Sequence, residues 1–360
     1  MCRVKCKYSI ELILNSNELI GYRFGNLYLL DAKNFSVIRK LASVNSYKET
    51  ILSHSKLFYK LFRLGIRASA KIDDETILLF VNKRLCEYSF ATHSLSDGKT
   101  FLSGVRPLKI SIIHSIDGFD DMVVFGGYLG NPNKKEVSVY CRTGIDSWKT
   151  IYTFPENLIN HIHNIVPDVS NKCVWILTGD FDKASAIWKA TYNFKKVEFV
   201  VGGEQKYRSC VAFPVNNGLL YATDTPFADN TIRFLIEESG EWTSKKICSI
   251  NGSCIYGCRV NDKYIFSTAV ESDGRGQTLK TLCFERKRGC GIKDDYCHLY
   301  VGGGDFVFED IYYVKKDIWP FVFQFGTLQF PEGDNNTGNI FVNHMATKHY
   351  DTSTIIISVN

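Results

Sequence analysis

Three strand-like segments that recur every 45 residues constrain the fold of this chain more than any other feature. They are WILTGD, LYATDT and IFSTAV. When these segments are aligned, the residues in register are Thr178, Thr223 and Thr268. A looser version of the same period extends upstream to VVFGGY at 123–128 and LLFVNK at 78–83. After turn formers such as GNPNKK and DFDKAS, a second strand-like run follows about ten residues later. The chain therefore consists of repeated units of short strands.

A repeat of this length, with several short strands and almost no helical periodicity, is typical of a β-propeller blade. A single sheet cannot bury both of its faces, so neighbouring blades stack and the ring closes. Units starting near residues 20, 78, 123, 175, 220, 265 and 308 predict an all-β fold of seven blades, with six as the alternative. The segment 49–67 is interpreted as a blade strand with one irregular or helical turn. Without a linker or low-complexity tract, residues 1–360 are expected to form one domain.

Composition and charge narrow the classes of function. A hydrophobic fraction of 45% is enough for a soluble core, and the net charge of +5 comes without a dense Lys/Arg stripe, which argues against nucleic-acid binding. The sequence has no apolar run typical of a signal peptide or a membrane span, so we expect a cytoplasmic protein. Its twelve cysteines include no CxxC pair, which favours buried free thiols over a structural zinc site. It gives no indication of the oligomeric state.

The segment VSVYCRTGIDSWKTIYTF at 137–154 resembles an Asp-box, the S-x-D-x-G-x-T-W turn, with Ser147 and Trp148 in the Ser/Thr and aromatic places. Cys141, Thr143 and Ile145 stand where that turn has Ser, Asp and Gly. Over residues 125–230, stretches such as HIHNIVPD, VWILTGDFD and GGEQKYRS are similar to sialidase-like (BNR/Asp-box) propeller proteins of bacterial polysaccharide metabolism. The resemblance implies a carbohydrate ligand. It also implies arginines around a sugar carboxylate, for which the chain offers Arg23, Arg106, Arg208 and Arg259.

Two histidines and two aspartates are the main candidates for catalysis. His161 and His163 are two residues apart, so on a strand both side chains point to one side, toward the channel. The pair suits acid/base work; no cofactor is predicted, although a divalent metal at this pair stays open. Asp180 and Asp224 follow strands that we interpret as inner ones, and as neighbours at a rim they would form an acid/base pair. The alternatives are a packed channel wall for the histidines and turn capping for the aspartates.

The segment GGEQKYRS adds Tyr207 as a further catalytic candidate, able to stack on a ring or donate a proton. Gln205 and Tyr207 alternate with Lys206 and Arg208, so one set is expected to face inward. Arg208 suits bidentate binding of an acidic sugar, or equally a structural salt bridge. The other predicted substrate-binding residues lie at equivalent rims or near the closure of the ring and are Arg106, Tyr128, Asn131, Lys316, Asp317 and Trp319.

These candidates favour action on, or recognition of, a charged oligosaccharide or polysaccharide intermediate. If the protein is an enzyme, the two aspartates would catalyse glycoside hydrolysis. In β-elimination, a His or Tyr would abstract the C5 proton while Arg208 neutralised the uronate. The alternative is a non-catalytic scaffold that binds protein partners at its rim. An exposed apolar patch there would favour the scaffold. A polar funnel holding carboxylate, imidazole and guanidinium groups would favour carbohydrate chemistry.

Overall fold

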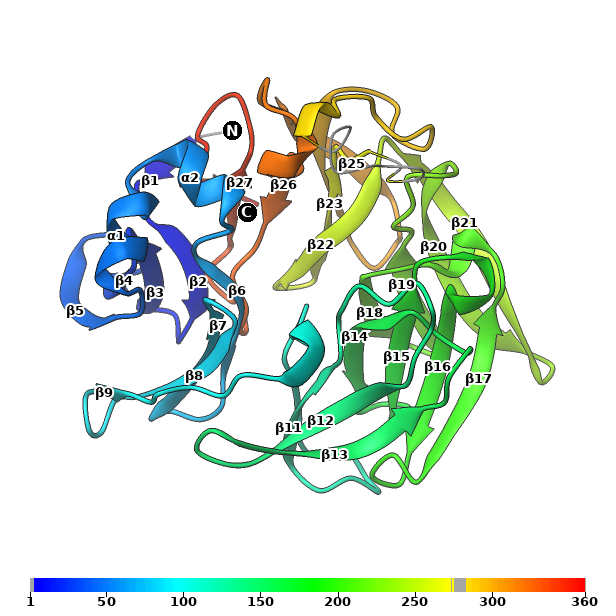
Figure 1. Ribbon diagram of the computed structural model, residues 1–360. Helices are drawn as coiled ribbons and strands as arrows, with labels where there is room; N and C mark the ends of the chain where they lie inside the picture. The colour runs from blue at the N-terminus through cyan, green and yellow to red at the C-terminus, as the bar shows by residue number, and fades with distance from the viewer. Residues whose placement is uncertain (1–2, 273, 275–282, 360) are drawn as a thin grey trace.

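The computed structural model describes residues 3–272, 274 and 283–359, and these form a ring of seven four-stranded antiparallel sheets around a central channel (Figure 1). The prediction of an all-β, seven-bladed propeller is confirmed. Among the helices of these residues, none has the length and apolar character needed to span a membrane.

The first three blades follow one another along the chain. Blade 1 contains β2 (Ser9–Ile13), β3 (Glu18–Arg23), β4 (Asn26–Asp31) and β5 (Val37–Ser43). Blade 2 contains β6 (Ile66–Lys71), β7 (Thr76–Val81), β8 (Arg84–Ser89) and β9 (Ser94–Leu95). A 3₁₀ turn, η1 (Leu102–Gly104), then leads to blade 3, which contains β10 (Ser111–Ile113), β11 (Met122–Gly126), β12 (Val137–Gly144) and β13 (Ser147–Phe154).

The next three blades repeat the same order. Blade 4 contains β14 (His161–Asp168), β15 (Cys173–Gly179), β16 (Ala186–Thr191) and β17 (Lys196–Gly202), with η2 (Asp182–Ala184) between β15 and β16. After η3 (Gln205–Tyr207), blade 5 contains β18 (Val211–Val215), β19 (Gly218–Ala222), β20 (Asn230–Glu238) and β21 (Glu241–Ile250). Blade 6 contains β22 (Ser253–Val260), β23 (Lys263–Ala269), β24 (Tyr296–Gly302) and β25 (Phe308–Lys315), and η4 (Phe321–Phe323) follows.

The seventh blade closes the ring with strands from both ends of the chain. Its inner strands are β26 (Thr327–Gln329), β27 (Asn339–Met345) and β28 (Thr354–Ser358), and its outermost strand is β1 (Arg3–Cys6). β1 pairs antiparallel with β28, which puts Arg3 opposite Ile357. The labelled chain ends accordingly lie close together in Figure 1.

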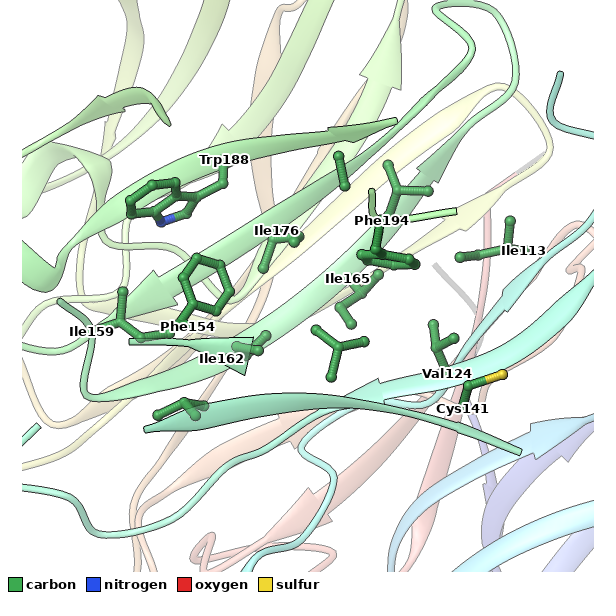
Figure 2. Close-up of a cluster of buried hydrophobic side chains, with 14 of the residues drawn as sticks. Ile113, Val124, Cys141, Phe154, Ile159, Ile162, Ile165, Ile176, Trp188 and Phe194 are labelled. Carbon is green, nitrogen blue, oxygen red and sulfur yellow. The ribbon is translucent and has the colours of Figure 1, made fainter. Parts of the chain in front are cut away.

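The hydrophobic core is divided among the interfaces between blades. Seven clusters of buried apolar side chains are present, and each joins two neighbouring blades of the ring. Figure 2 shows the cluster between blades 3 and 4, where Val124 and Cys141 from one sheet meet Ile162, Ile165 and Ile176 from the next. Every blade buries both faces in this way, because apolar residues on the two sides of its sheet pack against the two neighbouring blades. The described cysteines are all free thiols, and seven of them are buried.

Each blade begins with its innermost strand, and this order gives the ring two different ends. The loops that enter the first strands and the loops between second and third strands lie at one end, which we call the upper face. The loops between first and second strands and between third and fourth strands lie at the other end, the lower face. The seven inner strands line the channel between the two faces.

The three register threonines of the sequence mark the second strands of blades 4, 5 and 6. Thr178, Thr223 and Thr268 are all buried at the upper end of β15, β19 and β23. Each hydroxyl oxygen bonds to the third strand of its own blade, with distances of 3.2 Å to the carbonyl oxygen of Ala186, 2.8 Å to the backbone nitrogen of Thr231 and 2.9 Å to that of His298. The three positions are structurally equivalent.

Three sequence expectations about the blades are wrong. The segment 49–67 is not a blade strand but contains two short helices, α1 (Tyr47–Ser53) and α2 (Lys56–Leu61), on the upper face between blades 1 and 2. The unit near residue 308 is β25, the outer strand of blade 6, rather than the start of a blade. Asp180 and Asp224 follow second strands, not innermost ones.

Candidate functional site

The histidine pair lies on β14, the innermost strand of blade 4, where it lines the upper part of the channel. His161 and His163 are 5% and 2% exposed. The pairing of β14 with β15 shifts by one residue between Ile162 and Asn164, so His163 occupies a bulge. Gly179 on β15 makes room for this ring, because a Cβ atom there would lie 2.3 Å from His163 Cε1.

Both imidazoles have a polar contact at each of their ring nitrogens. Nδ1 of His161 lies 3.0 Å from the carbonyl oxygen of Leu129, and Nδ1 of His163 lies 2.9 Å from that of Ser209. The two Nε2 atoms face each other at 2.9 Å. Asp180 Oδ1 lies 3.3 Å from Nε2 of His161 and 3.1 Å from Nε2 of His163. Burial lowers the pKa of His161, and the nearby Asp180 only partly offsets this effect.

Asp180 is fixed by the groups around it. Its Oδ1 accepts a hydrogen bond from Arg208 Nη2 at 3.0 Å, and its backbone N–H donates to Asn160 Oδ1 at 3.3 Å. Its carbonyl oxygen accepts from Gln205 Nε2 at 3.0 Å and from Arg208 Nη1 at 3.2 Å. Burial alone would raise the pKa of Asp180, but the charge of Arg208 holds it well below its usual range. Asp180 is therefore a carboxylate at neutral pH.

A second layer of buried acidic groups lies beside Arg208. Asp224 Oδ2 is 3.6 Å from Arg208 Nε and accepts a bond from the Cys210 thiol at 3.2 Å. Burial raises the pKa of Cys210, so the thiol keeps its proton. Burial, and then the charge of Asp224, raise the pKa of Glu271 to about 8. Within the described part of the chain, hydrogen-bond partners are missing for four buried atoms of this layer: Arg208 Nε, Asp224 Oδ1, Ser253 Oγ and Glu271 Oε1.

An aromatic and a cationic side chain cover the histidines from blade 3. The Tyr128 ring lies 4.3 Å from the His161 ring and 6.0 Å from the His163 ring, measured between centroids. The Arg106 guanidinium carbon lies 4.5 Å from the Tyr128 centroid. Burial lowers the pKa of Arg106 to about 10. The structure thus brings seven predicted residues together in what we call the axial cluster: Arg106, Tyr128, His161, His163, Asp180, Arg208 and Asp224. Gln205 contacts it through the backbone of Asp180.

Two predicted residues on neighbouring loops do not enter the axial cluster with their side chains. Asn131 closes its own loop by bonding to the backbone N–H and carbonyl of Lys135. Tyr207 packs against the apolar cluster between blades 4 and 5. The expected alternation of inward and outward side chains is wrong here, because Gln205–Tyr207 form a 3₁₀ turn that directs both Gln205 and Arg208 to Asp180.

Lys316 and Asp317 belong to a separate buried charge cluster near the closure of the ring, to which the exposed Trp319 adds a backbone contact. Asp317 accepts bonds from Lys316 at 2.9 Å and from Lys60 of α2 at 2.5 Å. Lys60 also bonds to Asp351 at 3.1 Å, and Trp319 contributes its carbonyl oxygen to Lys316. This network fastens α2 to blades 6 and 7.

Of the four arginines nominated as carboxylate ligands, only Arg106 and Arg208 lie at the axial cluster. Arg259 lines a hollow of about 1310 Å³ at the lower end of the channel. Arg23 lines a hollow of about 220 Å³ on the upper face, between blades 1 and 7. The segment likened to an Asp-box forms the outer hairpin of blade 3, away from the channel.

Sequence reasoning missed Cys210, Glu271 and Asn160. A signal for Glu271 was present in the repeat, because an acidic residue follows each register threonine within three positions: Asp180, Asp224 and Glu271. Among the described residues, two groups have ligand atoms close enough to hold a metal ion. They are His161 with His163 and Asp180, and His163 with Cys210 and Asp224.

The raised pKa of Glu271 predicts a pH-dependent effect of the substitution Glu271→Gln. The folded protein keeps this proton from its ordinary pKa of 4.5 up to about 8, whereas the unfolded chain has lost it. Wild type therefore loses stability as the pH rises through this window, and the glutamine variant is spared this loss. The Tm of the variant minus the Tm of wild type should therefore increase by at least about 2 °C between pH 6 and pH 9.

Thermal denaturation monitored by circular dichroism at pH 6, 7, 8 and 9 measures this gain. Glu309→Gln is the matched control, because Glu309 is exposed on the outer strand β25. Parallel Tm curves for wild type and Glu271→Gln would show that Glu271 titrates normally.

Comparison with known proteins places the chain by its fold. Neither a protein-family model nor a curated protein matches it in sequence. Among solved structures, it is similar to the WD40 β-propeller domain of Doa1, with a TM-score of 0.56 and 9% identity over 100% of this chain and 96% of that one. The AfRom2 CNH domain gives a TM-score of 0.51 with 9% identity, covering 100% and 98%. A chain of the Mitotic Checkpoint Complex gives 0.54 with 9% identity, covering 99% and 88%.

The likeness is one of fold. At 9% identity it extends to the ring of blades and not to any function of these proteins.

Proposed function

We propose that this propeller is a non-catalytic scaffold that binds a partner protein on its upper face. The observation that carries the proposal is the uneven distribution of exposed large apolar side chains between the two ends of the ring. The described loops of the lower face present four: Ile145, Val169, Tyr192 and Val307. The described loops and helices of the upper face present ten: Tyr47, Ile51, Phe58, Phe62, Leu102, Phe181, Phe284, Ile318, Trp319 and Tyr350. Apolar side chains gathered on one face are typical of an interaction surface.

The charge of the upper face indicates the chemistry of the partner. The hollow of about 220 Å³ between blades 1 and 7 is lined by four cationic side chains: Lys5, Lys7, Arg23 and Lys56. Ion pairs found among the described residues involve none of these four cations. Asp351 also lines the hollow, but Lys60 binds it. The four cations can therefore attract carboxylates from a partner, and we infer that the partner presents an acidic segment with apolar side chains.

The similar structures support this proposal. One of them is a chain of the Mitotic Checkpoint Complex, by its name an assembly of several proteins, and another is the WD40 domain of Doa1. A propeller of this architecture can therefore serve as a docking platform.

Site-specific photo-crosslinking in cells of the source organism tests the proposal. A photoreactive phenylalanine analogue replaces Phe62 or Leu102 on the upper face, and Ile145 or Tyr192 on the lower face as matched controls. We expect one discrete adduct, the same from both upper positions, and none from the lower positions. In Lys5→Glu/Lys7→Glu protein the adduct should fall at least about tenfold, because charge reversal repels an acidic segment. Equal adducts from both faces, or none from either, would contradict the proposal.

Carbohydrate recognition is a second candidate, favoured by the convergence of imidazole, carboxylate and guanidinium groups in the axial cluster. Arg208 is already paired with Asp180 at 3.0 Å and lies near Asp224, which reduces what it can offer to a uronate. A panel of charged oligosaccharides tests this candidate by thermal shift, with stabilising sugars then assayed for new reducing ends and unsaturated products. A rise in Tm that Asp224→Asn abolishes would support it, and no shift with any sugar would remove its support.

A further inference from the structure

The two imidazoles of the axial cluster present unprotonated nitrogens to each other. A carbonyl oxygen only accepts hydrogen bonds, so the contacts with Leu129 and Ser209 place a proton on Nδ1 of each ring. In a neutral imidazole the other nitrogen then has no proton. Nε2 of His161 and Nε2 of His163 are therefore both acceptors, and they lie 2.9 Å apart.

Asp180 adds a third acceptor at the same point. Its Oδ1 is 3.3 Å from Nε2 of His161 and 3.1 Å from Nε2 of His163. Three lone-pair atoms in mutual contact repel one another unless a positive charge lies between them. Arg208 does not fill this role, because its Nη2 reaches Oδ1 at 3.0 Å but has no contact within hydrogen-bond or ion-pair distance to either imidazole.

We propose that His161, His163 and Asp180 bind one divalent transition-metal ion at the upper end of the channel. The three ligand atoms form a nearly equilateral triangle with edges of 2.9, 3.1 and 3.3 Å. With metal–ligand bonds of about 2.1 Å, neighbouring ligands of an octahedral ion lie about 3.0 Å apart, and those of a tetrahedral ion about 3.4 Å apart. The mean edge lies closer to the octahedral value, so the site fits one face of a six-coordinate ion.

The surroundings have the features expected of a metal site. Each ligand histidine donates its Nδ1 proton to a backbone carbonyl, which fixes the ring and its tautomer. Arg208 and the neighbouring Asn160 fix Asp180 in the same way. The Asp180 side chain keeps 25% of its exposure, so the ion and its remaining coordination positions can be reached from solvent.

Two imidazoles and one carboxylate on one octahedral face suit ions from Mn²⁺ to Ni²⁺, including Fe²⁺. A second group, His163 with Cys210 and Asp224, has its ligand atoms within a wider limit of 4.8 Å. Cys210 already donates its thiol proton to Asp224. We assign the ion to the first group. Only this assignment predicts that metal binding depends on His161.

Co²⁺ is a suitable probe, because its visible absorption reports coordination by protein ligands. Chelator-treated protein is titrated with CoCl₂ near pH 7.5 and followed by absorption, calorimetry and Tm. We expect one Co²⁺ per chain and a higher Tm. His161→Gln and Asp180→Asn should weaken binding by at least about 100-fold, the upper end of the loss seen when only an outer-shell partner of a metal ligand is removed. His344→Gln is the matched control, since His344 is also buried but lies on β27 in blade 7. It should bind Co²⁺ as wild type does.

A measurement on the wild-type protein keeps the proposal testable if a variant fails to fold. In imidazole NMR spectra, Co²⁺ should broaden the ring signals of His161 and His163 at one equivalent and leave those of His344 sharp. Binding that survives His161→Gln would move the ion to Cys210 and Asp224 and overturn the assignment. Wild-type protein that binds no Co²⁺, and carries a proton on one of the facing Nε2 atoms at pH 7.5, would overturn the proposal, because a shared proton would then separate the three acceptors.

Discussion

Arg208→Met is expected to lower the free energy of unfolding by about 3–5 kcal/mol, because breaking a buried ion pair leaves an uncompensated charge. Arg208 lies 3.0 Å from Asp180 Oδ1 and 3.6 Å from Asp224 Oδ2, and the residue is 8% exposed. Methionine fills similar volume but leaves both carboxylates without their cation. Equilibrium unfolding in urea at pH 7.5 measures the change.

A double variant and a matched control separate the charge effect from a packing effect. In Arg208→Met/Asp180→Asn one carboxylate is removed with the cation, so at least about 1 kcal/mol of the loss should return. Arg259→Met is the control, because this side chain is exposed, donates a hydrogen bond to the carbonyl of Asn261 and lies over the ring of Tyr264. It has no ion pair among the described residues, and its loss should change stability by less than about 0.5 kcal/mol. A loss of under 1 kcal/mol in Arg208→Met would mean that the axial charges are better solvated than their burial indicates.

Asn343→Ala is expected to lower the free energy of unfolding by about 2–4 kcal/mol, because this side chain connects blade 7 to blade 1. From β27 in blade 7, its Nδ2 donates to the carbonyl of Ile10 at 2.6 Å, and its Oδ1 accepts from the N–H of Ile10 at 3.1 Å. Ile10 lies on β2, the innermost strand of blade 1. Thr354 supports the contact, since its hydroxyl oxygen lies 2.5 Å from Asn343 Oδ1 and 2.7 Å from the carbonyl oxygen of Tyr8. Alanine leaves buried main-chain groups with fewer partners.

The same urea unfolding experiment measures this loss. Asn339→Ala is the matched control on the same strand, because Asn339 is only half buried and its side chain bonds within its own loop. We expect the control to cost less than about 1 kcal/mol. Equal losses for Asn339→Ala and Asn343→Ala would show that the polar contact between blades 7 and 1 has no special weight.

The fold was predictable because a threonine at one position of the repeat makes the same structural contact in successive blades. Thr178, Thr223 and Thr268 each bond to the third strand of their blade, so the period could be read from single residues. The seventh blade was misplaced in the sequence for a topological reason. Its outer strand, β1, comes from the other end of the chain, and a long connection separates β23 from β24 in blade 6, so the spacing fails there.

The axial cluster was predictable only in part. His161 and His163 lie on β14, where strand pleating predicts that both side chains face one side, and Asp180 directly follows β15. Tyr207 was mispredicted because strand alternation does not hold in the 3₁₀ turn Gln205–Tyr207. Which side chain of blade 6 meets Arg208 depends on the tilt between sheets, and no local pattern encodes that tilt. The repeat places an acidic residue at Glu271, but the sequence does not show that this residue lies beside Arg208.

Closure of the ring by β1 and β28 has a consequence for how the protein is made. The partners Arg3 and Ile357 are separated by almost the whole sequence, so β1 leaves the ribosome long before its partner exists. Until then β1 presents an open strand edge, which is prone to pair with other chains. Contacts this distant in sequence form late and slowly. Sealing of the ring is therefore the step at which nascent chains are most exposed to aggregation, and a circular permutant opened between two other blades would shift that hazard elsewhere in the sequence.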